Sequence, residues 1–224
     1  MSPSIQFPEL NQPLLKKSDV FAWAKSHYRD RTFSKDEQIP TRSGLIYLVE
    51  QGAIRIVGQS QMNVLNTKAT EEITSEEVFL GFIGEGQPFE IVSQPQFKLQ
   101  AYSHLDETVL IWIYWQDLEL LPNLRQEIFE SFRYQHQRKL FWLSILGQKR
   151  SVDRLMGFLN LLVEEYGKPC EQGYYLPYPL THSQMASAIG TTRVTVTRLM
   201  GKLRQQGLIF LYDEHLIGLP KLLQ

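Results

Sequence analysis

The spacing of apolar residues divides the chain into a strand-rich first half and a helical second half. In the first half, residues 45–49 form an apolar run, and Gly52 separates it from residues 53–57, where apolar and polar positions alternate. This pattern predicts two strands joined as a hairpin. Further short apolar runs bounded by turn residues occupy 78–83, 98–102 and 108–115.

The pattern changes at residue 121, after which no glycine occurs until Gly147. Apolar residues recur there at helical spacing on more than one face, which predicts a long helix packed on the first half of the chain and on a partner helix. A long core helix in a monomer is the alternative. After a hinge at 148–151, a second amphipathic helix is expected to reach Gly167. Its apolar face consists of Leu155, Phe158, Leu159 and Leu162.

Residues 180–209 predict two short helices joined by a glycine turn. Thr181 and Gln184 have the spacing of a capping box, which starts a helix. Gly190 follows where a left-handed residue would end that helix, and Thr191 or Thr192 can cap the next one. The buried face of the first helix would consist of Met185, Ala186 and Ile189, and that of the second of Val196, Leu199 and Leu203.

The opposite face of the second helix is the candidate surface for reading DNA, because a helix-turn-helix places its second helix in the major groove. That face consists of Arg193, Val194, Thr197 and Arg198. Arg193 and Arg198 are the candidate base contacts, since a guanidinium donates two hydrogen bonds to guanine. Val194 can touch a thymine methyl group and would favour an A·T pair.

Residues 190–203, GTTRVTVTRLMGKL, resemble the recognition helix of the CRP/FNR transcription regulators, and most of all that of their cyanobacterial nitrogen-regulator branch. The resemblance implies that Arg193 and Arg198 contact bases, with Val194 standing where the cyclic-AMP receptor branch has glutamate. It also implies GTA-type half-sites repeated as an inverted pair. Contacts to the DNA backbone are expected from Thr181, Ser183, Thr192, Thr195 and Lys202.

Residues 46–56, IYLVEQGAIRI, resemble part of the β-roll of the same family. The expected fold is therefore α+β, with a double-stranded β-roll over 1–120, a dimerisation helix over 121–147 and a winged helix-turn-helix over 148–224. Residues 208–212 and 216–219 predict the wing, although Asp213 and Glu214 between them would repel phosphate. A two-fold dimer presents two recognition helices about one DNA turn apart, which matches an inverted repeat.

The distribution of charge supports a DNA partner for the second half. Residues 1–120 hold 10 Lys and Arg against 16 Asp and Glu, whereas residues 121–224 hold 13 against 8. Positive charge on the second half favours phosphate binding. The absence of a secretory signal or a membrane-spanning apolar stretch predicts a cytoplasmic protein without a membrane partner. A single cysteine, Cys170, expected in a loop, excludes an intramolecular disulfide and a cysteine-ligated iron–sulfur cluster within one chain.

The sequence lacks the segment that binds the phosphate of cyclic nucleotides in the cyclic-nucleotide members of the family. Their phosphate cassette contains a Phe-Gly-Glu segment and an arginine, whereas here Phe89 is followed directly by Glu90, and no arginine lies between Arg55 and Arg125. No cofactor is predicted, and cyclic AMP has no anchor. Nitrogen regulators respond to 2-oxoglutarate, and an altered effector site is one interpretation of Arg133, Gln135 and Arg138. A solvated face of the helix is the other.

Two further classes of function remain. A metal-dependent enzyme of the cupin type is disfavoured, because the five histidines are scattered without ligand spacing. The alternative to a DNA-binding regulator is an interaction module whose degenerate roll docks another regulatory protein. Its clue is the large number of aromatic residues in the roll. Most of them must fill its interior, so only an exposed apolar patch would favour docking; they are Phe79, Phe82, Phe89, Trp112, Tyr114 and Trp115. The resemblance implies DNA, a second copy and RNA polymerase as partners, with a small-molecule or protein effector left open.

Overall fold

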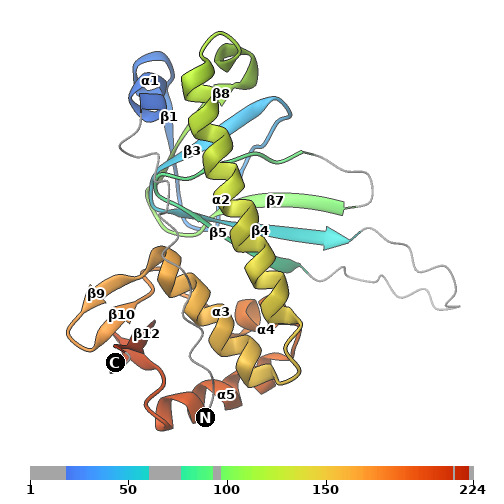
Figure 1. Ribbon diagram of the computed structural model, residues 1–224, viewed down its shortest axis with the longest axis vertical. Helices are drawn as coiled ribbons and strands as arrows, with labels where there is room; N and C mark the ends of the chain where they lie inside the picture. The colour runs from blue at the N-terminus through green and yellow to red at the C-terminus, as the bar shows by residue number, and fades with distance from the viewer. Residues whose placement is uncertain (1–18, 61–76, 93–96, 214, 222–224) are drawn as a thin grey trace, which may run out of the picture.

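The computed structural model describes residues 19–60, 77–92, 97–213 and 215–221 of the 224-residue chain. A helix, α1 (Asp19–His27), precedes a strand-rich domain (Figure 1). Its strands are β1 (Asp30–Phe33), β2 (Gln38–Ile39), β3 (Leu45–Gln51), β4 (Ala53–Ser60), β5 (Val78–Gly84), β6 (Pro88–Phe89), β7 (Phe97–Ser103) and β8 (Thr108–Tyr114).

These strands form two antiparallel four-stranded sheets, in the orders β1-β8-β3-β6 and β2-β7-β4-β5. Side chains from both sheets meet in one buried cluster, in which Tyr47 of β3 and Ile54 of β4 are almost fully enclosed. The predicted β-roll is therefore confirmed.

The predicted hairpin between residues 45–49 and 53–57 is wrong. β3 pairs with β8 and β6, whereas β4 pairs with β5 and β7, so the chain changes sheets between them. The apolar run belongs to a strand buried on both faces: Tyr47 faces the roll interior, and Ile46 packs on the helical side. Gly52 makes the corner with φ +82°, a conformation that glycine adopts at little cost.

Gly52→Val is expected to lower the free energy of unfolding by roughly 2 to 4 kcal/mol, because positive φ and close packing both oppose a side chain. A Cβ at this position would lie 2.7 Å from Thr108 Oγ1. Urea denaturation measures the change. Gly44→Val is the matched control, because Gly44 also has positive φ but its Cβ would meet no atom within 4 Å. Equal losses in the two variants would show that the approach to Thr108 is unimportant.

A short 3-10 helix, η2 (Trp115–Leu118), leads into the predicted long helix, α2 (Pro122–Leu146). Near its start, Ile128 packs with α1 and β8, and near its end Trp142 and Ile145 join the core of the C-terminal domain. On the other side of α2, Phe129, Leu140 and Leu143 are exposed. The helix thus has both the packed face and the free apolar face that the sequence predicts.

The C-terminal domain consists of three helices and a small sheet in the order β11-β12-β10-β9 (Figure 1). The antiparallel pair of β11 and β12 confirms the predicted wing, and Glu214 in its turn lies outside the described residues. The two strands β9 and β10 were not predicted, and Cys170 ends β9 rather than lying in a loop. The elements are α3 (Ser151–Tyr166), β9 (Lys168–Cys170), β10 (Gly173–Tyr175), α4 (His182–Ala188), α5 (Arg193–Gln205), β11 (Phe210–Tyr212) and β12 (Leu216–Pro220).

The roll and the C-terminal domain pack directly against each other. One buried cluster contains Phe79 and Phe82 of β5 together with side chains of α2, α3 and α4. The Phe79 backbone N–H donates to Ser187 Oγ at 2.9 Å, and Trp142 Nε1 donates to the Ala188 carbonyl at 3.1 Å. Buried hydrogen bonds of this kind fix the position of α4 relative to the roll.

His104 lies in the same junction, with Nε2 2.8 Å from the Pro179 carbonyl. Burial lowers the pKa of His104 to about 4, so the ring is neutral and Nε2 donates to Pro179. Since the unfolded chain takes up the proton near pH 6.5, stability is expected to fall by at most about 3 kcal/mol as the pH drops from 6.5 to 4. His104→Gln should flatten this part of the urea-denaturation pH profile, and an unchanged slope would contradict the assignment.

Candidate nucleic-acid interface

Local hydrogen bonds build the start of the helix-turn-helix as the sequence predicts. Thr181 Oγ1 accepts from the Gln184 backbone N–H at 3.1 Å, and Gln184 Oε1 accepts from the Thr181 N–H at 2.9 Å, which completes the capping box. Met185, Ala186 and Ile189 are buried. Gly190 has φ +63° and ends the helix in the left-handed conformation.

The second helix, α5, is capped by Thr192, whose Oγ1 accepts from the Thr195 backbone N–H at 3.2 Å. Its inward face differs slightly from the prediction, because Met200 is buried whereas Leu199 is only half-buried. Val196, Met200 and Leu203 lie four and three residues apart and form the tighter helical stripe. Leu199 lies at the edge of this stripe.

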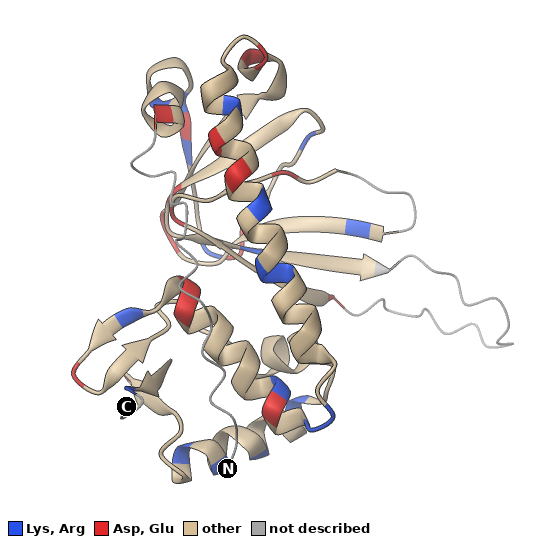
Figure 2. Ribbon diagram, in the orientation of Figure 1, with Lys and Arg blue, Asp and Glu red and all other residues tan. Residues whose placement is uncertain are grey.

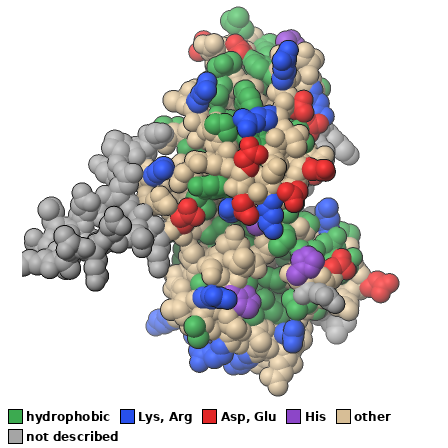
Figure 3. Space-filling model, turned by 180° about the vertical axis from the view of Figure 1, so that it is seen from behind, with side chains coloured by type: hydrophobic (Ala, Val, Ile, Leu, Met, Phe, Trp, Pro, Cys, Tyr) green, Lys and Arg blue, Asp and Glu red, His purple; other side chains and the backbone are tan. Residues whose placement is uncertain are grey.

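The outward face of α5 is exposed, basic and free of acidic residues. Arg193, Arg198 and Lys202 are exposed, and Val194 is 78% exposed. Within the described part of the chain, none of these three cations makes an ion pair. Figure 2 shows Lys and Arg along α5 and at the turn between α2 and α3. The space-filling view in Figure 3 shows basic side chains gathered at the same lower end of the molecule. This face can therefore meet a polyanion without first losing an internal partner.

The hydroxyl groups near this face have structural partners. Thr197 Oγ1 lies 2.8 Å from His182 Nδ1 and donates to the Arg193 carbonyl at 2.9 Å, so it ties α5 to α4. Thr192 Oγ1 and Thr195 Oγ1 are 3.0 Å apart. Ser183 is exposed at the first turn of α4. The contact of His182 with Thr197 was not predicted, because it depends on how α4 and α5 pack against each other.

Comparisons with known proteins agree with this geometry. Residues 153–222 match the model of the Crp-like helix-turn-helix domain. A global nitrogen regulator from Nostoc sp. is 38% identical over 99 residues, which are 44% of each chain. The regulatory protein CysR from Synechococcus elongatus is 28% identical and matches over 80% of this chain and 78% of its own. The C-terminal part of the chain therefore contains a Crp-like helix-turn-helix domain, and the chain as a whole is similar to regulators of the CRP/FNR type. The match to the Nostoc nitrogen regulator covers less than half of the length of that protein.

Solved structures share the CRP/FNR fold over nearly the whole chain. A cyclic nucleotide-binding domain containing protein from Listeria monocytogenes has a TM-score of 0.70 and 17% identity, and covers 91% of this chain and 97% of that one. FixK2 from Bradyrhizobium japonicum has a TM-score of 0.65 and 19% identity, with coverage of 86% and 92%. The likeness therefore includes the roll, the long helix and the C-terminal domain together.

Large side chains fill the interior of the roll. The rings of Tyr47 and Phe89 stack with centroids 4.9 Å apart, and Trp112 lies 6.3 Å from Tyr47. The Tyr47 hydroxyl donates to the Pro40 carbonyl at 3.0 Å, and burial raises its pKa. These three aromatic residues lie on neighbouring strands of one sheet, and their rings fill this part of the roll interior.

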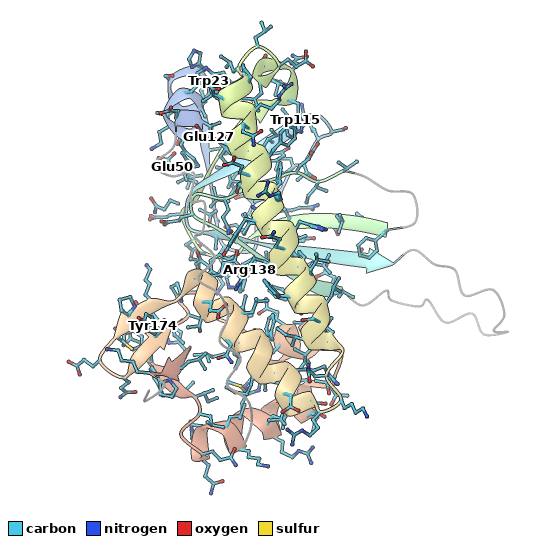
Figure 4. All side chains as sticks on the ribbon, viewed as in Figure 1. Trp23, Glu50, Trp115, Glu127, Arg138 and Tyr174 are labelled. Atoms are coloured by element: carbon cyan, nitrogen blue, oxygen red, sulfur yellow. The ribbon has the colours of Figure 1, made fainter. Side chains whose placement is uncertain are left out.

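Of the residues considered as an effector region, Gln135 and Arg138 line one small cavity between α2, α3 and β5, and Arg133 is not among its lining residues. Arg133 is exposed, and Gln135 Nε2 donates to the Pro88 carbonyl of β6 at 2.8 Å. Arg138 is buried, so the interpretation of the whole run as a solvated face is wrong for it. Its guanidinium donates to Glu164 at 3.0 Å, to Glu165 at 3.4 Å and to the Leu161 carbonyl at 2.5 Å. Arg138 therefore joins α2 to α3 (Figure 4).

The aromatic residues of the roll are mostly core, as the sequence predicts. Phe79, Phe82 and Phe89 are buried, Trp112 and Trp115 are half-buried, and Tyr114 is exposed. The roll aromatics thus contribute mainly to packing. Among the described residues, no helix is long and apolar enough to cross a membrane. No group of three His, Cys, Asp or Glu in the same residues is arranged to hold a metal ion.

Proposed function

We propose that the chain regulates transcription as a homodimer that places α5 in the major groove of an inverted-repeat operator. The exposed, acid-free face of α5 is the observation that carries this proposal. The proposal includes the division into domains that the sequence predicts: a roll over 1–120, a dimerisation helix over 121–147 and a DNA-binding domain over 148–224. A regulator of this kind works in the cytoplasm, with RNA polymerase as a further partner.

Arg193 and Arg198 are the residues that read bases. Both side chains are exposed on the outward face of α5, and each can donate two hydrogen bonds to a guanine. Val194, on the same face, offers methyl groups to thymine and no acceptor to cytosine. This combination supports GTA-type half-sites. Contacts to phosphate come from Thr181, Ser183, Thr192, Thr195 and Lys202, which lie at the helix starts and along α5.

The free face of α2 supports the dimer. Its exposed apolar residues are Phe129, Leu140 and Leu143. Together with the exposed Arg133 and His136 they follow one another at alternating spacings of four and three residues. This spacing is typical of the contact face of a two-stranded coiled coil. A partner helix would remove these apolar side chains from water. A two-fold axis along this seam presents two copies of α5, and an inverted repeat has the same symmetry.

The roll supports a regulator that binds its operator without cyclic AMP. Tyr47 and Phe89 fill the space between the sheets, and they are 1% and 3% exposed. A charged nucleotide would have to displace this packed aromatic pair. The loss of packing would cost about 3 to 5 kcal/mol of stability, as for other large side chains removed from a core. DNA binding in this proposal is therefore independent of that ligand.

Fluorescence anisotropy with labelled duplexes tests the proposal. Two GTA half-sites in inverted order, about one helical turn apart, should bind much more tightly than one half-site, the same half-sites in direct order, or a scrambled duplex. Cyclic AMP should leave all four affinities unchanged. Equal affinity for the inverted and scrambled duplexes would contradict specific reading. A strict requirement for cyclic AMP would contradict the independence from this ligand.

A further inference from the structure

An open groove of about 670 Å³ lies where the roll, the long helix and the helix-turn-helix meet. Its walls come from β5, from the C-terminal part of α2, from α4 and from the Gly190 turn that precedes α5. Figure 1 shows these segments converging beside the lower end of α2. Small-molecule sites in proteins have volumes of about 300 to 1,000 Å³, so the groove has the size for such a ligand.

The walls of the groove are mainly apolar. Phe79 and Trp142 form its floor with ring centroids 6.2 Å apart. Leu143 and Leu146 form the rim and are 62% and 36% exposed. The Trp142 indole N–H is already bound to the Ala188 carbonyl. The surface left for a ligand is therefore aromatic and aliphatic, and suits a hydrocarbon chain or ring.

One cation at the edge of the groove is available to a ligand. The Lys139 ammonium donates to the Leu80 carbonyl and lies 4.8 Å from the centre of the Trp142 ring, although the side chain as a whole is exposed. Burial of the ammonium group lowers the pKa of Lys139 to about 8, and none of the described carboxylates compensates its charge in an ion pair. A bound anion would supply that compensation.

The second cation of the groove, Arg154, is already used inside the protein. Its guanidinium donates to the Ile189 carbonyl at 2.9 Å, to the Gln148 carbonyl at 2.9 Å and to Ser151 Oγ at 3.1 Å. None of the described residues that line the groove is acidic. The groove therefore presents one point charge of positive sign beside an apolar wall.

We propose that this groove binds an amphiphilic carboxylic acid, with its apolar body against Phe79, Trp142 and Leu146 and its carboxylate on the Lys139 ammonium. A single lysine matches one compact anionic group, whereas a larger polyanion would need more donors. Because α4 and the Gly190 turn form one wall, a bound acid holds the helix-turn-helix against the roll. This consequence for DNA rests on the function proposed above, whereas the binding site itself does not.

Titration of the full chain with three probes that share a ten-carbon chain tests the site without DNA. Decanoate, decanol and decylammonium are added below the concentrations at which they aggregate, and the indole N–H signals are followed by ¹⁵N NMR. Decanoate should shift the Trp142 signal and leave that of Trp23, on α1, unchanged. Its Kd should be about tenfold lower than that of decanol, the usual value of one charge-assisted contact, and decylammonium should bind most weakly.

Lys139→Met should remove the preference for decanoate over decanol. Lys139→Arg should retain it, and Lys98→Met, at an exposed lysine of β7, is the matched control that should behave like the parent. If a variant does not fold, the comparison of decanoate with decanol at the Trp142 signal of the unaltered chain still tests the proposal. The proposal is overturned if Trp142 does not respond or if decanoate and decanol bind equally to the parent. It is also overturned if decanoate binding is lost as the chain dimerises, because a second copy then covers the groove.

Discussion

Replacing both Arg193 and Arg198 by alanine is expected to weaken binding to the inverted-repeat duplex by roughly 2 to 6 kcal/mol, since each arginine contributes about 1 to 3 kcal/mol of discrimination. Affinity for a scrambled duplex should fall by less, because that duplex loses only the electrostatic attraction of the two arginines and no base contacts. The reason is structural: both guanidinium groups are exposed on α5 and have no ion-pair partner in the described part of the chain. Anisotropy titrations with both duplexes measure the difference.

Lys202→Ala is the control for the arginine variants, because Lys202 lies on the same helix and is equally exposed. It should weaken all duplexes alike and reduce the slope of affinity against salt by about one. If the arginine variants instead lose the same free energy on specific and scrambled DNA, their assignment as base-reading residues is wrong. A loss confined to one of the two arginines would restrict base reading to that residue.

Replacing Arg138 by methionine should destabilise the protein by about 3 to 5 kcal/mol, the usual cost of leaving a buried charge without its partner. The Arg138 and Glu165 side chains are only 6% and 9% exposed, and Glu165 also accepts from Gln87 Nε2 at 2.8 Å. Removal of the guanidinium therefore leaves a nearly buried carboxylate and the Leu161 carbonyl with fewer donors. Urea denaturation gives the change in unfolding free energy.

Two matched variants separate charge burial from a general effect of losing arginine. Arg150→Met removes a pair with Asp153 whose members are 72% and 36% exposed, and should change stability little. Adding Glu165→Leu to Arg138→Met should recover part of the loss, because the unpaired carboxylate is then gone. Similar effects of Arg138→Met and Arg150→Met would contradict the role of Arg138 as a buried connection between α2 and α3.

The elements that sequence predicted best are those fixed by local interactions. The capping box of Thr181 and Gln184 and the left-handed Gly190 need only neighbours within one or two turns of the chain. For the same reason the outward face of α5 could be assigned from spacing alone. The β-roll and the wing followed from short apolar runs together with the resemblance to the family.

The features that sequence missed depend on contacts between distant segments. Residues 45–57 looked like a hairpin, but β3 is buried on both faces and Gly52 turns the chain into the opposite sheet. Arg138 looked like part of a polar face, because its partners Glu164 and Glu165 follow some 26 residues later on another helix. Pairing and burial across such separations are set by tertiary packing, which periodicity along one element does not report.

The same reasoning explains why the groove beside Trp142 has no signature in the sequence. Its walls combine β5, α2 and α4, and each contributes ordinary apolar residues at ordinary helical or strand positions. In the sequence, Lys139 looks like an ordinary charged residue on the exposed side of a helix. The structure shows that its ammonium group contacts the Leu80 carbonyl and the Trp142 ring. A surface assembled from three elements becomes visible only when their packing is known.

Selection of bound duplexes from a random DNA library with the purified chain tests the central claim most directly, which is that α5 reads DNA through a symmetric pair. The selected sequences should converge on two GTA-type half-sites in inverted order, with centres about 10 base pairs apart or a multiple of that. The variant lacking Arg193 and Arg198 should yield no common sequence. Failure of the parent chain to enrich any sequence, or enrichment of the same sequence by the variant, would contradict the account.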